Sequence, residues 1–204
     1  MLTLKGSAVS PGMTRGKAFI YKAEVLRETK KIEEDTGPLH TDQHERIKSA
    51  MTDVRHGLET DARQMSDVLD SHSGDIFLAQ SAMMQDSSVI EQLERYLGRG
   101  PIDAEEAVRA VFAIIASRVR GATSDVLRAR ADDVEDISRR LLLSLRGIHA
   151  NRLEGLPGGT VLVARHLFPS GTVFLSRSST VAVLAEFAGP AAHETDRRRS
   201  EQNG

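Results

Sequence analysis

The chain contains no cysteine and no tryptophan among its 204 residues. Without cysteine it has no disulfide, no thiolate nucleophile and no zinc or iron–sulfur site built on thiolates. Aromatic residues make up only 4%, which argues against surfaces that stack nucleic-acid bases or sugars. No apolar run reaches the roughly 18 residues of a membrane span, and Met1–Lys22 lacks the apolar core of a signal peptide. We therefore expect a cytoplasmic protein that does not bind membranes.

The chain also lacks an excess of charge of either sign. It has 27 Lys and Arg against 29 Asp and Glu, a formal net charge of −2. No global positive field attracts it to nucleic acid, so we expect no nucleic-acid partner. Hydrophobic residues make up 40%, enough at this length to bury the core of one domain or of two small ones.

Strand patterns occur at both ends of the chain. Leu4–Ser10 and Gly16–Lys22 flank a Pro-Gly turn and predict a hairpin-like pair. Thr160–Ala164 and Thr180–Ala185 are short runs rich in β-branched residues, and they predict two more strands of the same sheet. Between them, Gly171–Leu175 predicts one or two helical turns.

The middle of the chain follows a helical period of about 3.6 residues, with glycines that end each stretch and Asp86 and Asp103 as N-caps. These features predict four or five antiparallel helices. The pattern as a whole predicts an α/β domain formed by residues 1–30 and 147–204, with an all-α bundle, residues 38–146, inserted into it. The predicted bundle core consists of Ile47, Met51, Val54, Leu58, Phe77, Val111, Phe112, Ile115, Leu127, Val134, Ile137 and Leu141.

Several polar or adaptable residues are weak candidates for a site. His40 and His44 lie one helical turn apart, a spacing that binds metal in some proteins, but no third ligand accompanies them and we expect no metal site. The arginines near Arg130 alternate with aspartates, a pattern typical of a solvated, salt-bridged face, although a few of them could contact a partner. Met83 and Met84, at helical spacing from Phe77 and Leu78, fit a core better than an adaptable binding surface.

His193 has a more specific context. It follows the last predicted strand and the small residues of Ala188–Ala192, which leave the backbone accessible at a strand-to-helix junction. The neutral imidazole nitrogen is a nucleophile near pH 7, and the N–H groups of a following helix stabilise an anion. His193 is therefore a candidate phosphoryl acceptor, the alternative being an exposed histidine in a tail.

Motifs along nearly the whole chain, from Lys5 to His193, resemble one family. They are the opening Gly-Ser-Ala-Val-Ser-Pro-Gly with Gly-Lys-Ala after it, the Arg-Ala-Asp-Asp-Val-Glu-Asp-Ile stretch that starts at Arg130, Val-Leu-Val-Ala followed by Pro169-Ser170, and the junction at His193. In this order they resemble the N-terminal region of phosphotransferase-system enzyme I, the phosphoenolpyruvate–protein phosphotransferase. The resemblance implies a phosphohistidine domain with an inserted helical subdomain that binds the histidine phosphocarrier protein, HPr.

The sequence departs from the family pattern around the acceptor. The family's Gly-Gly-x-Thr-Ser-His is Ala-Gly-Pro-Ala-Ala-His at Ala188–His193, and its Leu-Thr-Pro-Ser is Leu-Phe-Pro-Ser at Leu167–Ser170, so three hydroxyls are missing. The tail, Glu194–Gly204, is polar where the family continues with an apolar helix, so the phosphohistidine domain is expected to be incomplete. The family's large domain that binds phosphoenolpyruvate and magnesium is not part of this sequence, so we expect no cofactor in this chain.

From the resemblance we expect His193 to exchange a phosphoryl group with HPr in the phosphotransferase system, whose sugar-transport and nitrogen branches both stay open at this point. Arg130 is the candidate for an electrostatic contact near that transfer. Gln80, Met84 and Asp86, together with Arg130, are the candidate partner-binding residues. The alternative is a non-catalytic interaction module or a truncated remnant of the family, so enzymatic activity stays open at this point.

Overall fold

A computed structural model of the chain describes Gly6, Ala8 and residues 11–21, 39–68, 71–124, 130–148, 153, 155–176 and 178–188. The chain divides into two compact units. One unit contains both ends of the chain, Met1–Ala23 and Leu153–Gly204, and the other contains Glu24–Arg152. Three of the sequence features, namely His193, Leu127 and most of Leu4–Ser10, lie outside the described residues.

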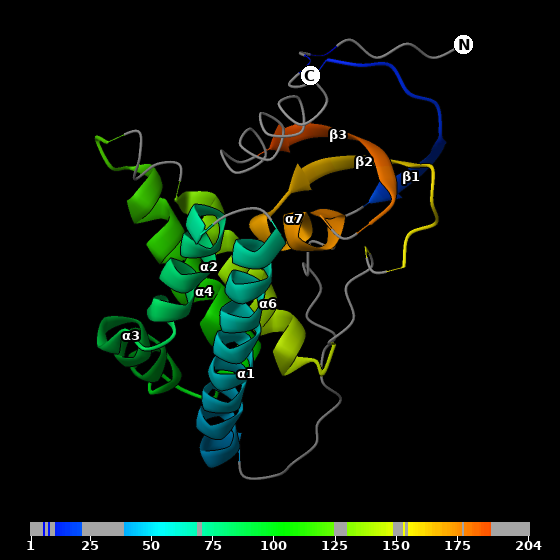
Figure 1. Ribbon diagram of the computed structural model, residues 1–204. Helices are drawn as coiled ribbons and strands as arrows, with labels where there is room; N and C mark the ends of the chain where they lie inside the picture. Colours follow the sequence, from blue (N-terminus) through cyan, green and yellow to red (C-terminus); the bar gives the residue numbers. More distant parts are fainter. Residues whose placement is uncertain are drawn as a thin grey trace. The chain divides into compact units, whose positions relative to one another are not determined.

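The first unit contains a parallel sheet. Its strands are β1 (Lys17–Tyr21), β2 (Thr160–Leu167) and β3 (Thr180–Ala188), in the order β1-β2-β3 (Figure 1). Both predicted C-terminal strands are confirmed and are longer than predicted. The predicted hairpin is not formed by the described residues, because β1 pairs in parallel with β2 and neither Gly6 nor Ala8 lies in a strand.

The start of the sheet depends on two glycines. Gly159 adopts a φ of +75°, a conformation that residues with a Cβ rarely adopt, and its carbonyl accepts a hydrogen bond from Lys17 N at 3.1 Å. A Cβ on Gly16 would collide with the same carbonyl oxygen. These glycines allow β1 to meet β2 across about 140 residues of intervening chain.

Helix α7 (Pro169–Ser176) connects β2 to β3, as two parallel strands require. It begins with proline, whose missing N–H has no partner to lose in the first turn. The core of this unit consists of Tyr21, Leu153, Leu162, Ala164 and Leu167, with Phe174 and Leu175 of α7 packed against it.

The second unit is helical throughout its described elements (Figure 1). They are α1 (Leu39–Val68), α2 (Ser71–Met83), α3 (Ser87–Leu97), α4 (Ala104–Arg120) and α6 (Ala131–Leu145). Helix α1 packs against α2 and α6, and α4 packs against α6 and α3. The predicted N-caps are confirmed: Asp86 accepts from Ser88 N at 2.8 Å, and Asp103 accepts from Glu106 N at 2.7 Å.

Ten of the twelve predicted core residues are buried, among them Leu58, Ile137 and Leu141 at 0% exposure. Ile115 is only half-buried. The buried stripe of α4 ends on Ala116, one residue further along the helix, which leaves Ile115 at the margin of the core. The prediction for Ile115 is therefore wrong.

Candidate functional site

The predicted partner-binding residues occupy two different environments. Gln80 and Met84 are buried, at 1% and 4% exposure, so neither is available on the surface. Asp86 and Arg130 are exposed at the first turns of α3 and α6. The hydrogen bonds that the Ser88 hydroxyl and backbone N–H donate to Asp86 lower the pKa of its carboxyl group.

Gln80 and Arg130 meet through a residue that the sequence did not single out. Asp133 accepts a hydrogen bond from Gln80 Nε2 at 3.4 Å and forms an ion pair with Arg130 Nη1 at 3.1 Å. Burial raises the pKa of Asp133, and the Arg130 guanidinium opposes that rise. The spacing of three residues on α6 was the available signal for the Arg130–Asp133 pair. Nothing local pointed to Gln80, which is 53 residues away.

Asp133 belongs to a longer set on α6, here called the α6 polar row and made up of Arg130, Asp133, Asp136 and Arg140. Asp136 has 0% exposure, and Arg140 lies 3.8 Å from it. Arg140 also pairs with Asp61 of α1 at 2.7 Å and lies over the ring of Phe77. Burial raises the pKa of Asp61, more strongly than Arg140 lowers it. The row therefore carries charge into the helical core and is not only a solvated face.

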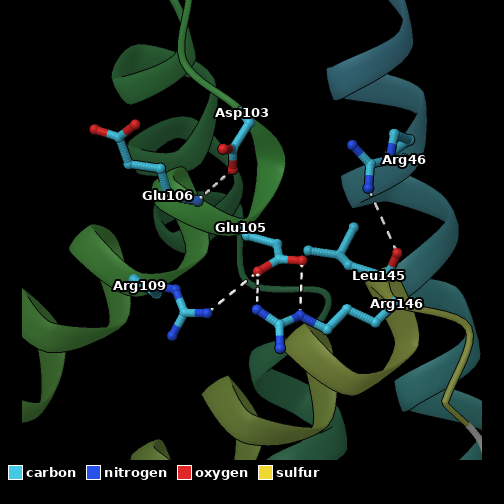
Figure 2. Close-up of polar contacts among 7 residues, drawn as sticks. All are labelled: Arg46, Asp103, Glu105, Glu106, Arg109, Leu145 and Arg146. Atoms are coloured by element: carbon cyan, nitrogen blue, oxygen red, sulfur yellow. Dashed lines mark hydrogen bonds and ion pairs between the residues drawn. The ribbon is translucent and has the colours of Figure 1, made fainter. Parts of the chain in front are cut away.

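A second polar cluster joins the start of α4 to the end of α6, and Figure 2 shows it. Glu105 accepts two hydrogen bonds from Arg146, at 2.9 and 2.7 Å, and one from Arg109 at 3.2 Å. The hydrogen bonds from Arg146 are the main reason that the pKa of Glu105 is lowered. We call Glu105, Arg109 and Arg146 the Glu105 clamp. Beside it, Arg46 of α1 donates to Leu145 O at 3.5 Å (Figure 2).

Helix α2 exposes a large apolar residue next to a buried one. Leu78 is 52% exposed, whereas its neighbour Phe77 is 2% exposed. Ala82, one turn further along α2, is also exposed, as is Asp86 after the end of the helix. Leu78 and Ala82 lie four residues apart on α2, and Asp86 follows as the N-cap of α3. We call these three exposed residues the α2 surface row.

In the first unit, the carboxyl ends of β2 and β3 lie together. Leu167 and Ala188 are paired in register, and α7 begins two residues after Leu167. His166 and Phe168 stack here, with ring centroids 4.3 Å apart. Phe168 stands where the family pattern has threonine, so an aromatic stack replaces a hydroxyl. His193 follows Ala188 by five residues and lies outside the described residues.

The other candidates give no further site. His40 and His44 both fall in α1, and His44 is exposed. Among the residues described, no three His, Asp or Glu side chains are grouped as a metal ion would require. None of the described helices combines the length and the hydropathy that a membrane crossing requires.

Comparison with known proteins identifies the class. The family described as PEP-utilising enzyme, N-terminal, matches residues 5–130, and the chain belongs to that family. The phosphoenolpyruvate-protein phosphotransferase of Mycoplasma pneumoniae is 29% identical over 201 residues, which cover 98% of this chain and 34% of that protein. The same enzyme of Priestia megaterium is 23% identical, over 97% of this chain and 34% of its own length. The chain therefore corresponds to about a third of these relatives.

Solved structures agree with this assignment. A solution structure of Enzyme I (nEIt) is 27% identical with a TM-score of 0.74, over 97% of this chain and 79% of that one. The N-terminal domain of Enzyme 1 - Nitrogen, 19% identical, shares the fold with a TM-score of 0.62, over 92% of this chain and 77% of that one. The resemblance to enzyme I is confirmed, as is a mixed fold of helices and a small parallel sheet.

Proposed function

We propose that this chain is the phosphotransfer region of an enzyme I-like protein and that His193 exchanges a phosphoryl group with HPr. In each transfer the phosphorus–nitrogen bond to the HPr histidine breaks as the bond to His193 forms, and the reverse reaction returns the group. The family membership of the chain supports this proposal, together with its likeness to Enzyme I at a TM-score of 0.74.

The observation that carries the proposal is the edge of the sheet where β2 and β3 end. The pairing of Leu167 with Ala188 brings the strand before His193 to the place where α7 starts. His193 follows Ala188 by five residues, a length of chain that spans at most about 18 Å when fully extended. The start of α7 carries the positive end of a helix dipole, which favours a phosphate group nearby.

The α2 surface row supports docking of a partner protein. Leu78 offers an exposed apolar contact, and Asp86 adds a negative charge that favours a partner with basic groups. Gln80 and Met84 would act from beneath this surface, because both are buried. We assign Arg130, whose side chain is 49% exposed, to the electrostatic contact with the transferred phosphoryl group.

The proposed domain organisation follows from the same reading. Residues 1–30 and 147–204 form the phosphohistidine-like domain, and residues 38–146 form an inserted antiparallel subdomain for HPr. The division of the chain into one unit from both ends and one from the middle supports this organisation. A role in sugar uptake through a cytoplasmic phosphotransferase system is part of the proposal.

Labelling by phospho-HPr tests the chemistry. The chain should accept phosphate on one histidine, through a bond that is labile in acid and stable in base. His193→Ala should abolish the label and leave the circular dichroism spectrum unchanged. His44→Ala, which removes an exposed histidine of α1, is the matched control and should be labelled like the original chain. A chain that binds HPr but takes no label would support the non-catalytic interaction module instead.

Titration with HPr tests the docking surface separately. Leu78→Asp should weaken HPr binding by about tenfold or more, since exposed apolar anchors carry much of the energy of an interface. Ile114→Asp changes a comparably exposed apolar residue of α4 and should bind HPr normally. Equal effects of the two substitutions would remove the α2 surface row from the proposal.

A further inference from the structure

Arg130 is held from one side only. Its Nη1 pairs with Asp133 Oδ2 at 3.1 Å, while its side chain remains 49% exposed against 14% for Asp133. None of the other described residues accepts a hydrogen bond from Arg130. Because the guanidinium is planar and rigid, a bond at Nη1 restricts the directions of Nη2 and Nε as well.

Asp133 also forms a hydrogen bond with a buried residue. Its other oxygen, Oδ1, accepts from Gln80 Nε2 at 3.4 Å, so the two oxygens of one carboxylate serve two different elements, α2 and α6. Gln80 has 1% exposure, so its amide lies in the helical core. Asp133 therefore connects the exposed cation of Arg130 to a buried amide.

The second polar atom of the Gln80 amide has an unusual environment. This atom, Oε1, is buried and has no hydrogen-bond partner. Buried polar atoms are nearly always paired, so the unpaired oxygen of Gln80 requires an explanation. The amide of Gln80 is oriented so that its donor meets the Asp133 carboxylate, and its acceptor is left unpaired as a result.

We propose that Asp133, held by Gln80, is the positioning residue for Arg130 in phosphoryl transfer. The inference rests on the function proposed above. Asp133 occupies Nη1 and keeps Nη2 and Nε free for two oxygens of the phosphoryl group as it passes between histidines. A cation oriented in advance stabilises the charge on these oxygens without first losing its own freedom of motion. The other charged groups of the row, Asp136 and Arg140, lie further along α6 and do not contact Arg130.

Single-turnover transfer from phospho-HPr is the test, with variants Arg130→Ala, Asp133→Asn, Gln80→Leu and the double variant Arg130→Ala/Asp133→Asn. Asp133→Asn should lower the transfer rate at saturating phospho-HPr by about 10- to 100-fold, as misplaced catalytic groups do, and leave half-saturation unchanged. The double variant should be no slower than Arg130→Ala alone, because both changes disable one unit. Gln80→Leu should show the same defect in weaker form. Asp132→Asn, a change of the neighbouring carboxylate, is the matched control and should react within twofold of the original chain.

A second measurement reports on the orientation of the Arg130 guanidinium without phosphoryl transfer. The Nε–Hε signal of Arg130 in a nitrogen–proton correlation spectrum should be distinct in the original chain and should move to the free-arginine position in Asp133→Asn. A free-arginine signal in the original chain would overturn the positioning role. So would additive losses in the double variant, or normal transfer by Asp133→Asn in a chain that is otherwise labelled. An original chain that takes no label overturns the proposed function, and this inference with it.

Discussion

The fold shifts the pKa values of carboxyl groups in opposite directions in the two polar clusters around α6. In the Glu105 clamp, one carboxylate receives two guanidiniums, and hydrogen bonds from Arg146 lower its pKa. Between α1 and the α6 polar row, the three carboxylates of Asp61, Asp133 and Asp136 share two guanidiniums, and burial raises the pKa of Asp61 and of Asp133. Both clusters contain close ion pairs, so the presence of an ion pair does not decide whether the pKa of a carboxyl group is raised or lowered.

The direction of the pKa shift follows from the ratio of guanidiniums to carboxylates and from burial. Where guanidiniums outnumber carboxylates and water is partly present, the charged form of the acid is favoured in the fold. Where carboxylates outnumber guanidiniums and are buried, loss of water and mutual repulsion favour the neutral form. The Glu105 clamp therefore stabilises the helical unit near neutral pH. Burying the charges of the α6 polar row lowers the stability of the unit, so stability does not account for the row.

Arg140→Met should cause the largest loss of stability. It removes the partner of Asp61 at 2.7 Å and a cation near fully buried Asp136. Breaking a buried ion pair by removing one partner costs about 3–5 kcal/mol, which urea unfolding at pH 7 should measure. The loss should shrink in acid, because protonation neutralises the carboxyl group of Asp61. A loss under about 1 kcal/mol, typical of surface pairs, would show that the row is effectively solvated.

Leu141→Ala provides the apolar reference beside Arg140. Leu141 has 0% exposure, and large-to-small changes at such sites cost about 2–5 kcal/mol. This loss should be the same at pH 4 and pH 7, because no titrating group is removed. Ile115→Ala, at the margin of the core, should cost clearly less. Equal losses for Leu141 and Ile115 would mean that the margin is packed as tightly as the centre.

Glu105→Gln should weaken the unit by about 2 kcal/mol at neutral pH, the usual value of hydrogen bonds to a charged group. Because the pKa of Glu105 is lowered in the fold, its stabilisation is present above the ordinary glutamate value of 4.5 and is lost as the pH falls through the folded pKa. The original chain and the variant should therefore converge below that value. Leu141→Ala removes no titrating group and is the control, so its difference from the original chain should not change with pH.

Asp61→Asn should have the smallest effect on stability, with a pH dependence opposite to that of Glu105→Gln. The pKa of Asp61 is raised, so its favourable contribution is complete below the ordinary aspartate value of 3.8 and is lost as the pH rises through the folded pKa. At pH 7 the asparagine variant should be as stable as the original chain or up to about 1 kcal/mol more stable. The neutral amide avoids the cost of burying a charge, and Arg140 keeps Asp136 nearby. The advantage should vanish in strong acid. A clear loss at pH 7 would place Asp61 with the Glu105 clamp instead.

Much of the fold is readable from the sequence for local reasons. The short runs rich in β-branched residues predict β2 and β3, and the helical period predicts the elements from α1 to α6. The caps at Asp86 and Asp103 satisfy backbone N–H groups only two or three residues away. The same local patterns support the resemblance to enzyme I, which comparison confirms.

The tertiary structure decides which face of a helix points inward where the pattern is ambiguous. The run around Phe77 contains apolar residues on several sides, so period alone did not show that Leu78 is exposed and Gln80 buried. The packing of α2 against α1, with its contact to Asp133 of α6, settles this choice. The parallel partner of β1 was likewise hidden, because a nearby turn favours a hairpin and the true partner is about 140 residues away in the chain.

By itself, the sequence determined the elements, their caps, the family and the position of the candidate acceptor, since these depend on neighbours in the chain. Only the tertiary structure decided that Asp133 links Arg130 to Gln80 and that the charges of Asp61 and Glu105 affect stability in opposite senses. The physical reason is that a charge responds to the water it has lost and to the groups around it, and folding brings both from distant parts of the chain.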